Sequence, residues 1–489
     1  MNKKSTLRSV ANDYLTHPKE NRAITLVALV VTIVILLILA GVSFNMVLGN
    51  NGIAKKAQDA KKNTEMAATD ESKTLDSIEQ LINQFTGARE KIAVTNYYDS
   101  LEDAINDANN DVTTNGKEYF AEAKAKIEID EQNNVYVLPL EDVSINTEVQ
   151  VGSAKGYTLD LNNKTITLSE NGYFSQQSGK KLVLDDNGTS GNIIKNVNSS
   201  TGQQIINSSG ELVLNNGTYS LINSGKGNTI AFRMENTTCI LNGGRITSEN
   251  TDSGNVSGIQ ITGTEANTVI NNVSCSAKSV NALARAIDVF GEKNNEQKPK
   301  VIINGGEFKS FSGKNMALGC DFEVVEATIN NGNFEAVGDK NSQSGIACML
   351  ANGENDIIVN NVKMNSSGNL ACGIVSQNNK NGKFQINNCE IFADSYKGDG
   401  MGIQISNSVI EINDGNVITE GGGPGAIITS ENCVINGGYF RGIHSGIQIN
   451  SKSNVAHING GTFESPMHGG MYILRKCKYK ERNVKAWNL

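Results

Sequence analysis

The chain has 489 residues, and its 51 Asp and Glu residues outnumber its 43 Lys and Arg residues, so the formal net charge is −8 at pH 7. An acidic chain without a basic stripe fits poorly with nucleic-acid binding, which needs clustered positive charge to neutralise phosphates. The eight cysteines form no Cys-x-x-Cys pair, so the sequence supports neither a metal site nor another cofactor.

Residues 23–48 form an uncharged apolar run that follows a leader, residues 1–22, with several basic side chains. A run of this length is sufficient to cross a bilayer as a helix, whereas a cleaved secretory signal has a shorter one. We therefore expect a single-pass transmembrane helix, with the leader in the cytoplasm and the rest of the chain outside the cell. Basic residues also follow the run, so charge alone does not set the orientation.

Residues 22–26 read Arg-Ala-Ile-Thr-Leu and lead directly into the apolar run. This segment resembles the N-terminus of type IV pilin-like (prepilin-type) proteins. The resemblance implies that a peptidase cleaves between Ala23 and Ile24 and methylates the new amino terminus. The chain has Ala23 where that family has Gly, and Ala28 where it has the Glu that helps to register subunits in a pilus. An uncleaved signal anchor is the alternative.

Two helical segments are predicted between the apolar run and the repeats. The Gly and Asn residues at 49–52 should end the first helix, and the polar, Ala- and Lys-rich residues after them predict a helical stalk over 49–90. Residues 91–134 then contain an amphipathic helix with Ser100 as a suitable N-cap. Its apolar side chains share one face: Leu101, Ala104, Ile105 and Ala108. We expect this region to cap a solenoid, whose first coil would otherwise expose its core and an unpaired strand edge.

A short pattern recurs through residues 135–473: two apolar residues that flank a variable one, then Asn, two turn residues that usually include Gly, a variable residue and an apolar one. Asp185 fills a degenerate twelfth place, and successive anchors lie 23 to 33 residues apart, which is the period range of solenoids. The anchoring residues are Asn162, Asn215, Asn242, Asn271, Asn304, Asn330, Asn360, Asn387, Asn413, Asn436 and Asn459.

The pattern predicts three strands in each repeat. The residue before each anchor and the residue four after it are almost always apolar, and they alternate with variable positions as in a half-buried strand. A third strand recurs between repeats as Gly-Ile-x-apolar, for example at 258–261, 402–405 and 446–449. We therefore predict an all-β solenoid, a parallel β-helix of about twelve coils. The pattern resembles the right-handed parallel β-helix proteins, a fold shared by pectate lyases and many surface adhesins, and the resemblance covers residues 135–473.

The Asn-Gly pairs have a mechanical reason. Gly accepts positive φ at little steric cost, and Asn both tolerates that conformation and hydrogen-bonds locally. Stacked coils should line the anchoring asparagines into a ladder, so we interpret these residues as structural. The same register predicts that Cys239, Cys275 and Cys433 face inward in distant coils as free thiols.

Residues 474–489 are predicted to be a basic C-terminal tail, because the repeat pattern stops after Ile473. A C-terminal cap, a basic contact patch and a tail left by premature termination of a longer array are all compatible with this segment.

Polysaccharide lyases and hydrolases with this fold place charged residues in an external groove, and the chain shows none of their local motifs. Three pairs are the available catalytic candidates: Arg285 with Asp288, Asp394 with Asp399, and His444 with His468. The two histidines follow their anchors by eight and nine residues in adjacent coils, so they should share a face. An ordinary solvated loop residue is the alternative interpretation of each candidate.

The sequence thus predicts a bacterial cell-surface protein, anchored in the cell membrane through residues 23–48, with its β-helix outside the cell. Binding or display is the expected function, with carbohydrate or a surface partner as the ligand, since outward strand positions are rich in Thr, Asn, Ser and Gln. The alternatives are a polysaccharide lyase or glycoside hydrolase, and a minor pseudopilin that assembles with pilus or secretion subunits.

Overall fold

The computed structural model describes residues 92–489 apart from 112–114, 294, 296, 341–344, 380–381, 407, 431, 451–455, 474–476, 480–483 and 489. The chain divides into two compact units, residues 1–87 and 88–489, and all the described residues belong to the second. The predicted leader, transmembrane helix and stalk lie outside the described residues, as does the processing position between Ala23 and Ile24. Within the part that is described, no helix is long and apolar enough to cross a membrane.

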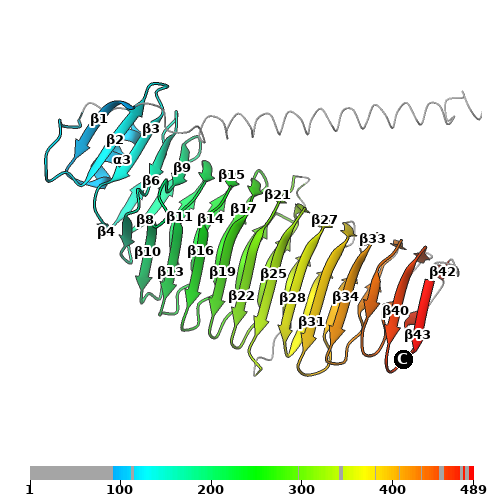
Figure 1. The fold of residues 1–489 in the computed structure, drawn as a ribbon. Coiled ribbons are helices and arrows are strands. Elements are labelled where there is room, and N and C mark those ends of the chain that lie inside the picture. The colour runs from blue at the N-terminus through cyan, green and yellow to red at the C-terminus, as the bar shows by residue number, and fades with distance from the viewer. Residues whose placement is uncertain are drawn as a thin grey trace, which may run out of the picture. The chain divides into compact units, whose positions relative to one another are not determined.

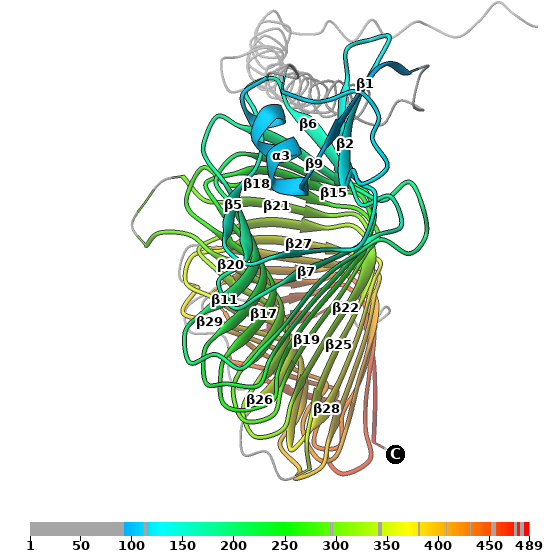
Figure 2. The same cartoon turned by 90° about the vertical axis from the view of Figure 1, so that its left-hand side faces the viewer.

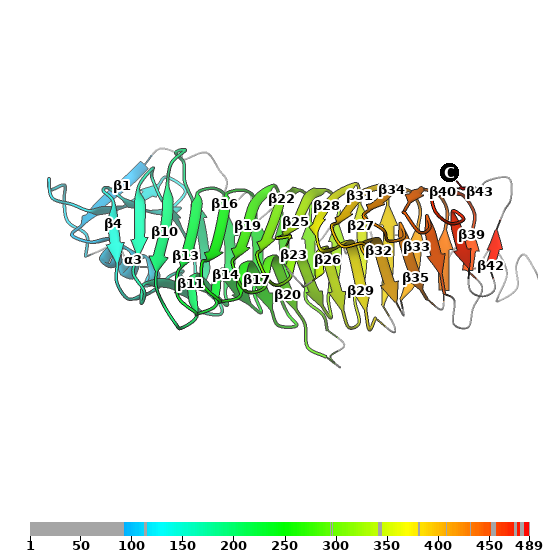
Figure 3. The ribbon, with the colours of Figure 1, turned by 90° about the horizontal axis from the view of Figure 1, so that it is seen from below.

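The second unit is a parallel β-solenoid of about twelve turns, as the repeat pattern predicts (Figure 1). Each full turn contributes one strand to each of three sheets, A, B and C, so strands three apart in chain order are hydrogen-bonded neighbours. Seen from below, the strands of successive turns lie side by side along the whole unit (Figure 3).

Sheet A has 16 strands within the described residues, and from β3 onward its strands pair in parallel. They are β1 (Ile92–Tyr98), β2 (Ala125–Asp130), β3 (Val135–Pro139), β6 (Tyr157–Asp160), β9 (Lys181–Asp185), β12 (Glu211–Leu214), β15 (Thr238–Leu241), β18 (Asn267–Ile270), β21 (Lys300–Ile303), β24 (Glu326–Ile329), β27 (Asp356–Asn360), β30 (Lys383–Asn387), β33 (Val409–Ile412), β36 (Asn432–Ile435), β39 (Ala456–Ile458) and β42 (Cys477–Tyr479).

Sheet B follows the anchoring residues and has 14 described strands. They are β4 (Val143–Ile145), β7 (Thr165–Leu168), β10 (Asn192–Val197), β13 (Thr218–Asn223), β16 (Arg245–Asn250), β19 (Val273–Ser279), β22 (Gly306–Ser312), β25 (Gly332–Gly338), β28 (Val362–Gly368), β31 (Cys389–Ser395), β34 (Gly415–Glu420), β37 (Tyr439–Arg441), β40 (Gly461–Ser465) and β43 (Val484–Asn488).

Sheet C contains the Gly-Ile-x-apolar segments and has 13 strands in the part of the chain that is described. They are β5 (Glu148–Gln150), β8 (Tyr173–Gln176), β11 (Gln203–Ser208), β14 (Thr229–Glu235), β17 (Val256–Thr262), β20 (Ala284–Phe290), β23 (Ala317–Glu323), β26 (Gly345–Asn352), β29 (Leu370–Gln377), β32 (Met401–Ser406), β35 (Ala426–Thr429), β38 (Ile447–Ile449) and β41 (Met471–Ile473).

The predicted amphipathic helix is present as α3 (Leu101–Asn109), and the side chain of Ser100 accepts a hydrogen bond of 3.0 Å from the backbone N–H of Asp103. Its apolar face joins the main core, with Leu101 and Ala104 fully buried. The helix packs on β1, β2, β3 and β5, and β1–β2–β3 is antiparallel. Figure 2 shows α3 in front of the stacked strands at this end, where it covers the first turns.

The interior consists of stacked apolar side chains, because the two predicted inward columns do face the core. Every residue four after an anchoring asparagine is at most 2% exposed, from Ile166 to Phe463. Aromatic members of this column stack on one another, with ring centroids 4.9 Å apart for Phe308 and Phe334 and 5.3 Å apart for Phe440 and Phe463. This geometry combines dispersion contact with a favourable ring arrangement in neighbouring turns.

The anchoring asparagines form a continuous hydrogen-bonded row along sheet A. From Asn242 to Asn459, each side-chain amide donates to the side-chain oxygen of the preceding anchor, at distances from 2.6 to 3.1 Å. Asn162 is not in this row. Asp160 is the register partner of Asp185, and Asn162 instead donates to the carbonyl of Pro139 at 2.9 Å.

The turn after each of the ten asparagines from Asn215 to Asn459 contains one residue with positive φ, and the sequence supplies it in two ways. In seven turns a Gly two residues after the anchor takes φ between 92° and 148°: Gly217, Gly244, Gly306, Gly332, Gly415, Gly438 and Gly461. In three others the residue directly after the anchor takes φ between 50° and 55°: Asn272, Asn361 and Asn388. Asn tolerates this left-handed conformation better than other side chains.

The glycine of the third strand has a different reason. A Cβ at Gly402 would lie 2.3 Å from Cγ1 of Val417 and 2.6 Å from the carbonyl oxygen of Gly425. This close approach between strands of sheets B and C leaves no room for a side chain, which explains why Gly recurs in the Gly-Ile-x-apolar segments.

The C-terminal region differs from the sequence expectation, whereas the thiols agree with it. Strands β42 and β43 pair in parallel with β39 and β40, so strand pairing continues within the segment that the pattern assigns to a tail after Ile473. The expectation of inward thiols outside any disulfide is confirmed for Cys239, Cys275 and Cys433, and Cys320, Cys348, Cys372 and Cys389 are likewise buried and not disulfide-bonded.

Candidate functional site

The structure brings together the first predicted pair, Arg285 and Asp288, on the outer face of sheet C, and it adds Asp321 from the next strand. Nε of Arg285 lies 2.6 Å from Oδ2 of Asp321 and 3.4 Å from Oδ1 of Asp288. Oδ2 of Asp288 also accepts hydrogen bonds from Ser257 at 3.0 Å and Gln260 at 3.1 Å. The cluster therefore connects three neighbouring strands, β17, β20 and β23.

Burial dominates the electrostatics of this cluster. It raises the pKa of Asp288 to about 6, against the opposing attraction of the Arg285 guanidinium. It raises the pKa of Asp321 as well. The side chain of Asp288 is 0% exposed, so a substrate has no access to it in this arrangement. An ion-pair network that ties strands together accounts for these contacts.

The other two predicted pairs differ from one another. The rings of His444 and His468 do share a face, stacked with centroids 5.6 Å apart and planes inclined by 13°. Asp394 lies at the end of β31, in register with Glu420 of β34, whereas Asp399 is exposed in the loop after β31. Across the described residues, no group of three or more His, Cys, Asp or Glu side chains is arranged to hold a metal ion.

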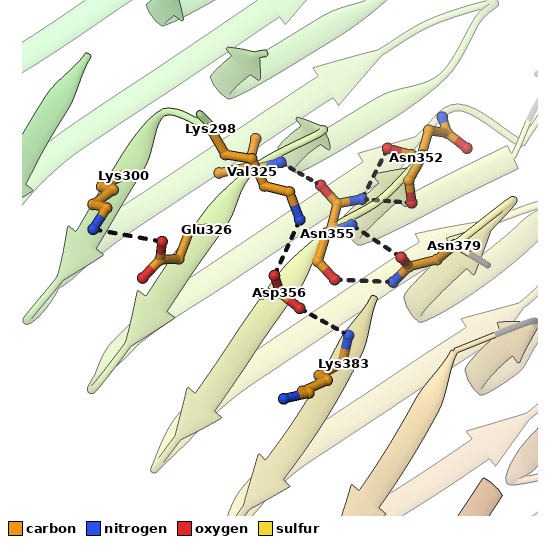
Figure 4. Close-up of polar contacts among 10 residues, drawn as sticks. Lys298, Lys300, Val325, Glu326, Asn352, Asn355, Asp356, Asn379 and Lys383 are labelled. Carbon is orange, nitrogen blue, oxygen red and sulfur yellow. Dashed lines mark hydrogen bonds and ion pairs between the residues drawn. The ribbon is translucent and has the colours of Figure 1, made fainter. Parts of the chain in front are cut away.

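A polar network at the corner between sheets C and A is shown in Figure 4. Asn355 accepts a 2.8 Å hydrogen bond from the backbone N–H of Val325 and donates one of 2.8 Å to the carbonyl of Asn352. Asn379 repeats the arrangement one turn later, accepting from the backbone N–H of Asn355 at 2.9 Å. Both asparagines are fully buried, so they satisfy backbone groups at the corner and do not face a ligand.

A groove of about 490 Å³ lies on the outer face of sheet B, beside the turns that follow the asparagine row. It crosses β16, β19, β22 and β25, and its central residues are register neighbours: Arg245, Ser274, Glu307 and Asn333. Three of these four side chains are exposed, and Ser274 is partly exposed. Sequence reasoning identified the outward polar positions but did not identify this row, because register between distant strands depends on the lengths of the loops.

A second pocket, of about 370 Å³, lies where strands of sheets B and C meet near α3, and we call it the Lys195 pocket. Its lining is almost entirely polar: Thr147, Glu148, Glu170, Asn171, Tyr173, Lys195, Thr201, Gly202, Gln203 and Gln204. Sequence reasoning missed these residues. The available signal was the alignment of Ile193 with the inward Tyr219, which places Lys195, two residues later, in a core column.

Lys195 occupies an inward position of sheet B, in register between Leu168 and Leu221, and is 1% exposed. Its ammonium group donates to the carbonyl oxygens of Gly172 at 2.8 Å and Gln204 at 3.2 Å. Burial lowers the pKa of Lys195 to about 8, and the charge of Glu170 opposes this shift. An amine at a position that holds Leu in both neighbouring turns costs solvation free energy that an apolar residue would not.

Glu148, on the rim of the same pocket, is held in place by several donors. Its Oε1 accepts hydrogen bonds from Ser175 at 2.5 Å and Gln150 at 2.8 Å. The hydrogen bonds from Ser175 and Tyr173 lower the pKa of Glu148, so the carboxylate stays ionised at neutral pH. The pocket thus combines a fixed anion, a second exposed carboxylate at Glu170 and a buried cation.

Fold and surface together define a parallel β-helix with polar external sites. No protein-family model, curated protein or solved structure matches this chain.

Proposed function

We propose that this protein is a membrane-anchored cell-surface module whose β-helix binds an extended carbohydrate polymer along the outer face of sheet B. The observation that carries the proposal is the groove across β16, β19, β22 and β25, lined by polar residues from four consecutive turns. In this proposal the solenoid has the right-handed coil of pectate-lyase-like proteins, because parallel crossovers are almost always right-handed.

The spacing of the groove residues suits a repeating ligand. Neighbouring strands lie about 4.8 Å apart, so the four-residue row extends over roughly 14 Å. The spacing between neighbouring strands is comparable to the length of one pyranose ring, so each turn of the solenoid can contact one sugar unit. Arg245 donates hydrogen bonds, Glu307 accepts them, and Ser274 and Asn333 do both, which matches the donor and acceptor capacity of sugar hydroxyls.

The membrane part of the proposal rests on the sequence of residues 23–48. An apolar run of this length, with a pilin-like start, supports insertion in the cell membrane with the β-helix outside the cell. Pilus or secretion subunits are the alternative partners. A polysaccharide lyase or glycoside hydrolase is the other alternative function, and the covered carboxyl of Asp288 does not support it.

The proposal is tested with the full-length chain, extracted from membranes in detergent and applied to an array of polysaccharides. We expect binding to at least one linear polymer, and we expect Asn333→Arg to weaken it by about tenfold or more, because the new side chain fills the groove. Asn416→Arg is the matched control, since Asn416 occupies an equivalent exposed outward position in β34, outside the groove. The proposal would be contradicted if the protein bound none of the polymers, or if both variants lost the same amount of affinity. Its membrane part would be contradicted if the protein were released from cells without detergent.

A further inference from the structure

The Lys195 pocket is separate from the groove on sheet B, with which it shares no residue. We infer that it is a second binding site, for a small saccharide unit that carries a free amine, and that Lys195 and Glu148 are its principal binding residues. The inference rests on where the lysine lies, on the fixed carboxylate and on the charge of the lining.

The first step concerns the position of Lys195. Its neighbours in the core column, Leu168 and Leu221, show that the fold accommodates a branched apolar side chain at this position of sheet B. A lysine in their place donates two of its three hydrogen bonds to backbone carbonyls. None of the ion pairs among the described residues involves its ammonium group, although the charge of Glu170 acts on it. Although Lys195 is 1% exposed, it is one of the residues that line the pocket, so its third N–H donor remains for an oxygen of a ligand there.

The second step concerns what the rest of the pocket offers. Glu148 is ionised and held by Ser175 and Gln150, so it presents an organised acceptor at little further entropic cost. The amide side chains of Asn171, Gln203 and Gln204 and the hydroxyl groups of Thr147 and Thr201 add donors and acceptors. Tyr173 supplies the one aromatic ring of the lining. Dense hydrogen bonding around a single ring, in a volume of about 370 Å³, fits a polyhydroxylated ligand of sugar size.

The third step concerns charge. The lining holds two carboxylates, Glu148 and Glu170, against one lysine, so its formal charge is −1 when Lys195 is protonated and −2 when it is not. An acidic ligand meets net repulsion, and a neutral sugar forms only ordinary hydrogen bonds. An ammonium group gains charge-assisted hydrogen bonds to the carboxylates, while a ring hydroxyl accepts from Lys195. Among saccharide units, the amine-bearing ones therefore fit best.

The test compares three sugars that differ only at one ring carbon: glucosamine, glucose and N-acetylglucosamine. Binding to the full-length protein in detergent is measured by calorimetry at about pH 6.5, below the ordinary pKa range of such amines. We expect glucosamine to bind about tenfold more tightly than the other two. We expect Glu148→Gln to abolish that preference and Lys195→Met to abolish binding. Glycine, a small zwitterion, is included as a competing ligand class.

Stability distinguishes a binding role for Lys195 from a structural one. Methionine matches the apolar column, so Lys195→Met should have a melting temperature at least as high as that of the parent at pH 7. Folding lowers the pKa of Lys195 from 10.5 to about 8. Between about pH 8 and pH 10.5 the unfolded chain therefore binds more protons than the folded protein does. The parent should therefore gain stability as pH rises through that window, and the variant should not.

Lys278→Met is the matched control, because Lys278 is an exposed lysine of sheet B that pairs with Glu249 away from the pocket. It should leave glucosamine binding unchanged, and so should Asn333→Arg, which separates this site from the groove. Failure of all three sugars to bind would overturn the site, and equal binding of the three, or stronger binding of glycine, would overturn the ligand class. A Lys195→Met variant that is markedly less stable at pH 7 would assign Lys195 a structural role instead.

Discussion

At the scale of single residues, the cost of buried charge explains the most unusual positions in the chain. Lys195 and Asp288 are both fully covered, yet they differ in what surrounds them. Asp288 has Arg285, Ser257 and Gln260 as partners, so its charge is partly compensated within the protein. Among the described residues, the ammonium group of Lys195 donates hydrogen bonds to two backbone carbonyls, and Lys195 lines a pocket. The contacts of Asp288 are typical of a structural network, whereas those of Lys195 are the basis of the second binding site that we propose.

The raised pKa of Asp288 leads to a prediction about pH. The folded-state pKa, about 6, lies above the ordinary value of 3.8, so the folded protein binds more protons between these pH values and loses stability as pH rises through them. Asp288→Asn removes this penalty. We expect the variant to be more stable than the parent by about 1 to 3 kcal/mol at pH 8, with no difference near pH 4. Urea unfolding at the two pH values measures the difference.

The exposed Asp399→Asn substitution in the loop after β31 is the control for that experiment, and it should change stability by less than about 0.5 kcal/mol at either pH. If the parent protein lost no stability relative to the Asn variant between pH 4 and pH 8, the pKa of Asp288 would not be raised on folding, and Arg285 would balance or outweigh the effect of burial.

At the scale of the repeating element, the asparagine row is the feature that links one turn to the next outside the core. Asn387 donates to Asn360 at 2.6 Å and accepts from Asn413 at 2.7 Å. Replacing it with Ala removes both hydrogen bonds and leaves two amide groups without these partners. Since Asn387 is only partly exposed, water replaces them incompletely, and we expect a loss of about 1 to 3 kcal/mol.

A second substitution at the same position separates the contributions of the two hydrogen bonds. Asn387→Asp keeps an oxygen that accepts from Asn413 but cannot donate to Asn360 at neutral pH, so it should cost roughly half as much as Asn387→Ala. Asn416→Ala, an exposed outward change in the following turn, should be nearly neutral. Equal free energies of unfolding for Asn387→Ala and Asn416→Ala would mean that the row contributes to register and not to stability.

At the scale of the whole molecule, the repeat pattern predicts most of the fold of the β-solenoid. Each anchor and the apolar positions on either side of it predict two strands and a turn. Apolar and variable positions alternate along each strand because one face of the strand is buried. One anchor and one pair of strands show where this reasoning stops. Asn162 was assigned to the row, but Asp160 takes that register position because its neighbour Leu159 aligns with Leu184. Strands β42 and β43 have no visible anchor, so the pattern did not predict them.

The candidate sites were less predictable than the fold, for a physical reason. Residues that meet across strands are separated by the full length of a turn, and loop lengths vary between turns. The pair Arg285 and Asp288 lies within one strand and could be predicted, whereas Asp321, 36 residues from Arg285, could not. Lys195 was missed because the turn after Asp185 is longer than the others, which hides the alignment of Ile193 with Tyr219.

A solenoid is held together by contacts between neighbouring turns, so damage in one turn should stay local. Phe334 is 1% exposed and stacks on Phe308 of the preceding turn. Phe334→Ala should cost about 3 to 5 kcal/mol through lost burial and a residual cavity. We expect faster hydrogen exchange in β22, β25 and β28, measured by mass spectrometry, with unchanged exchange in β10 and β13. Faster exchange throughout all of these strands would show instead that residues 88–489 unfold as one cooperative unit.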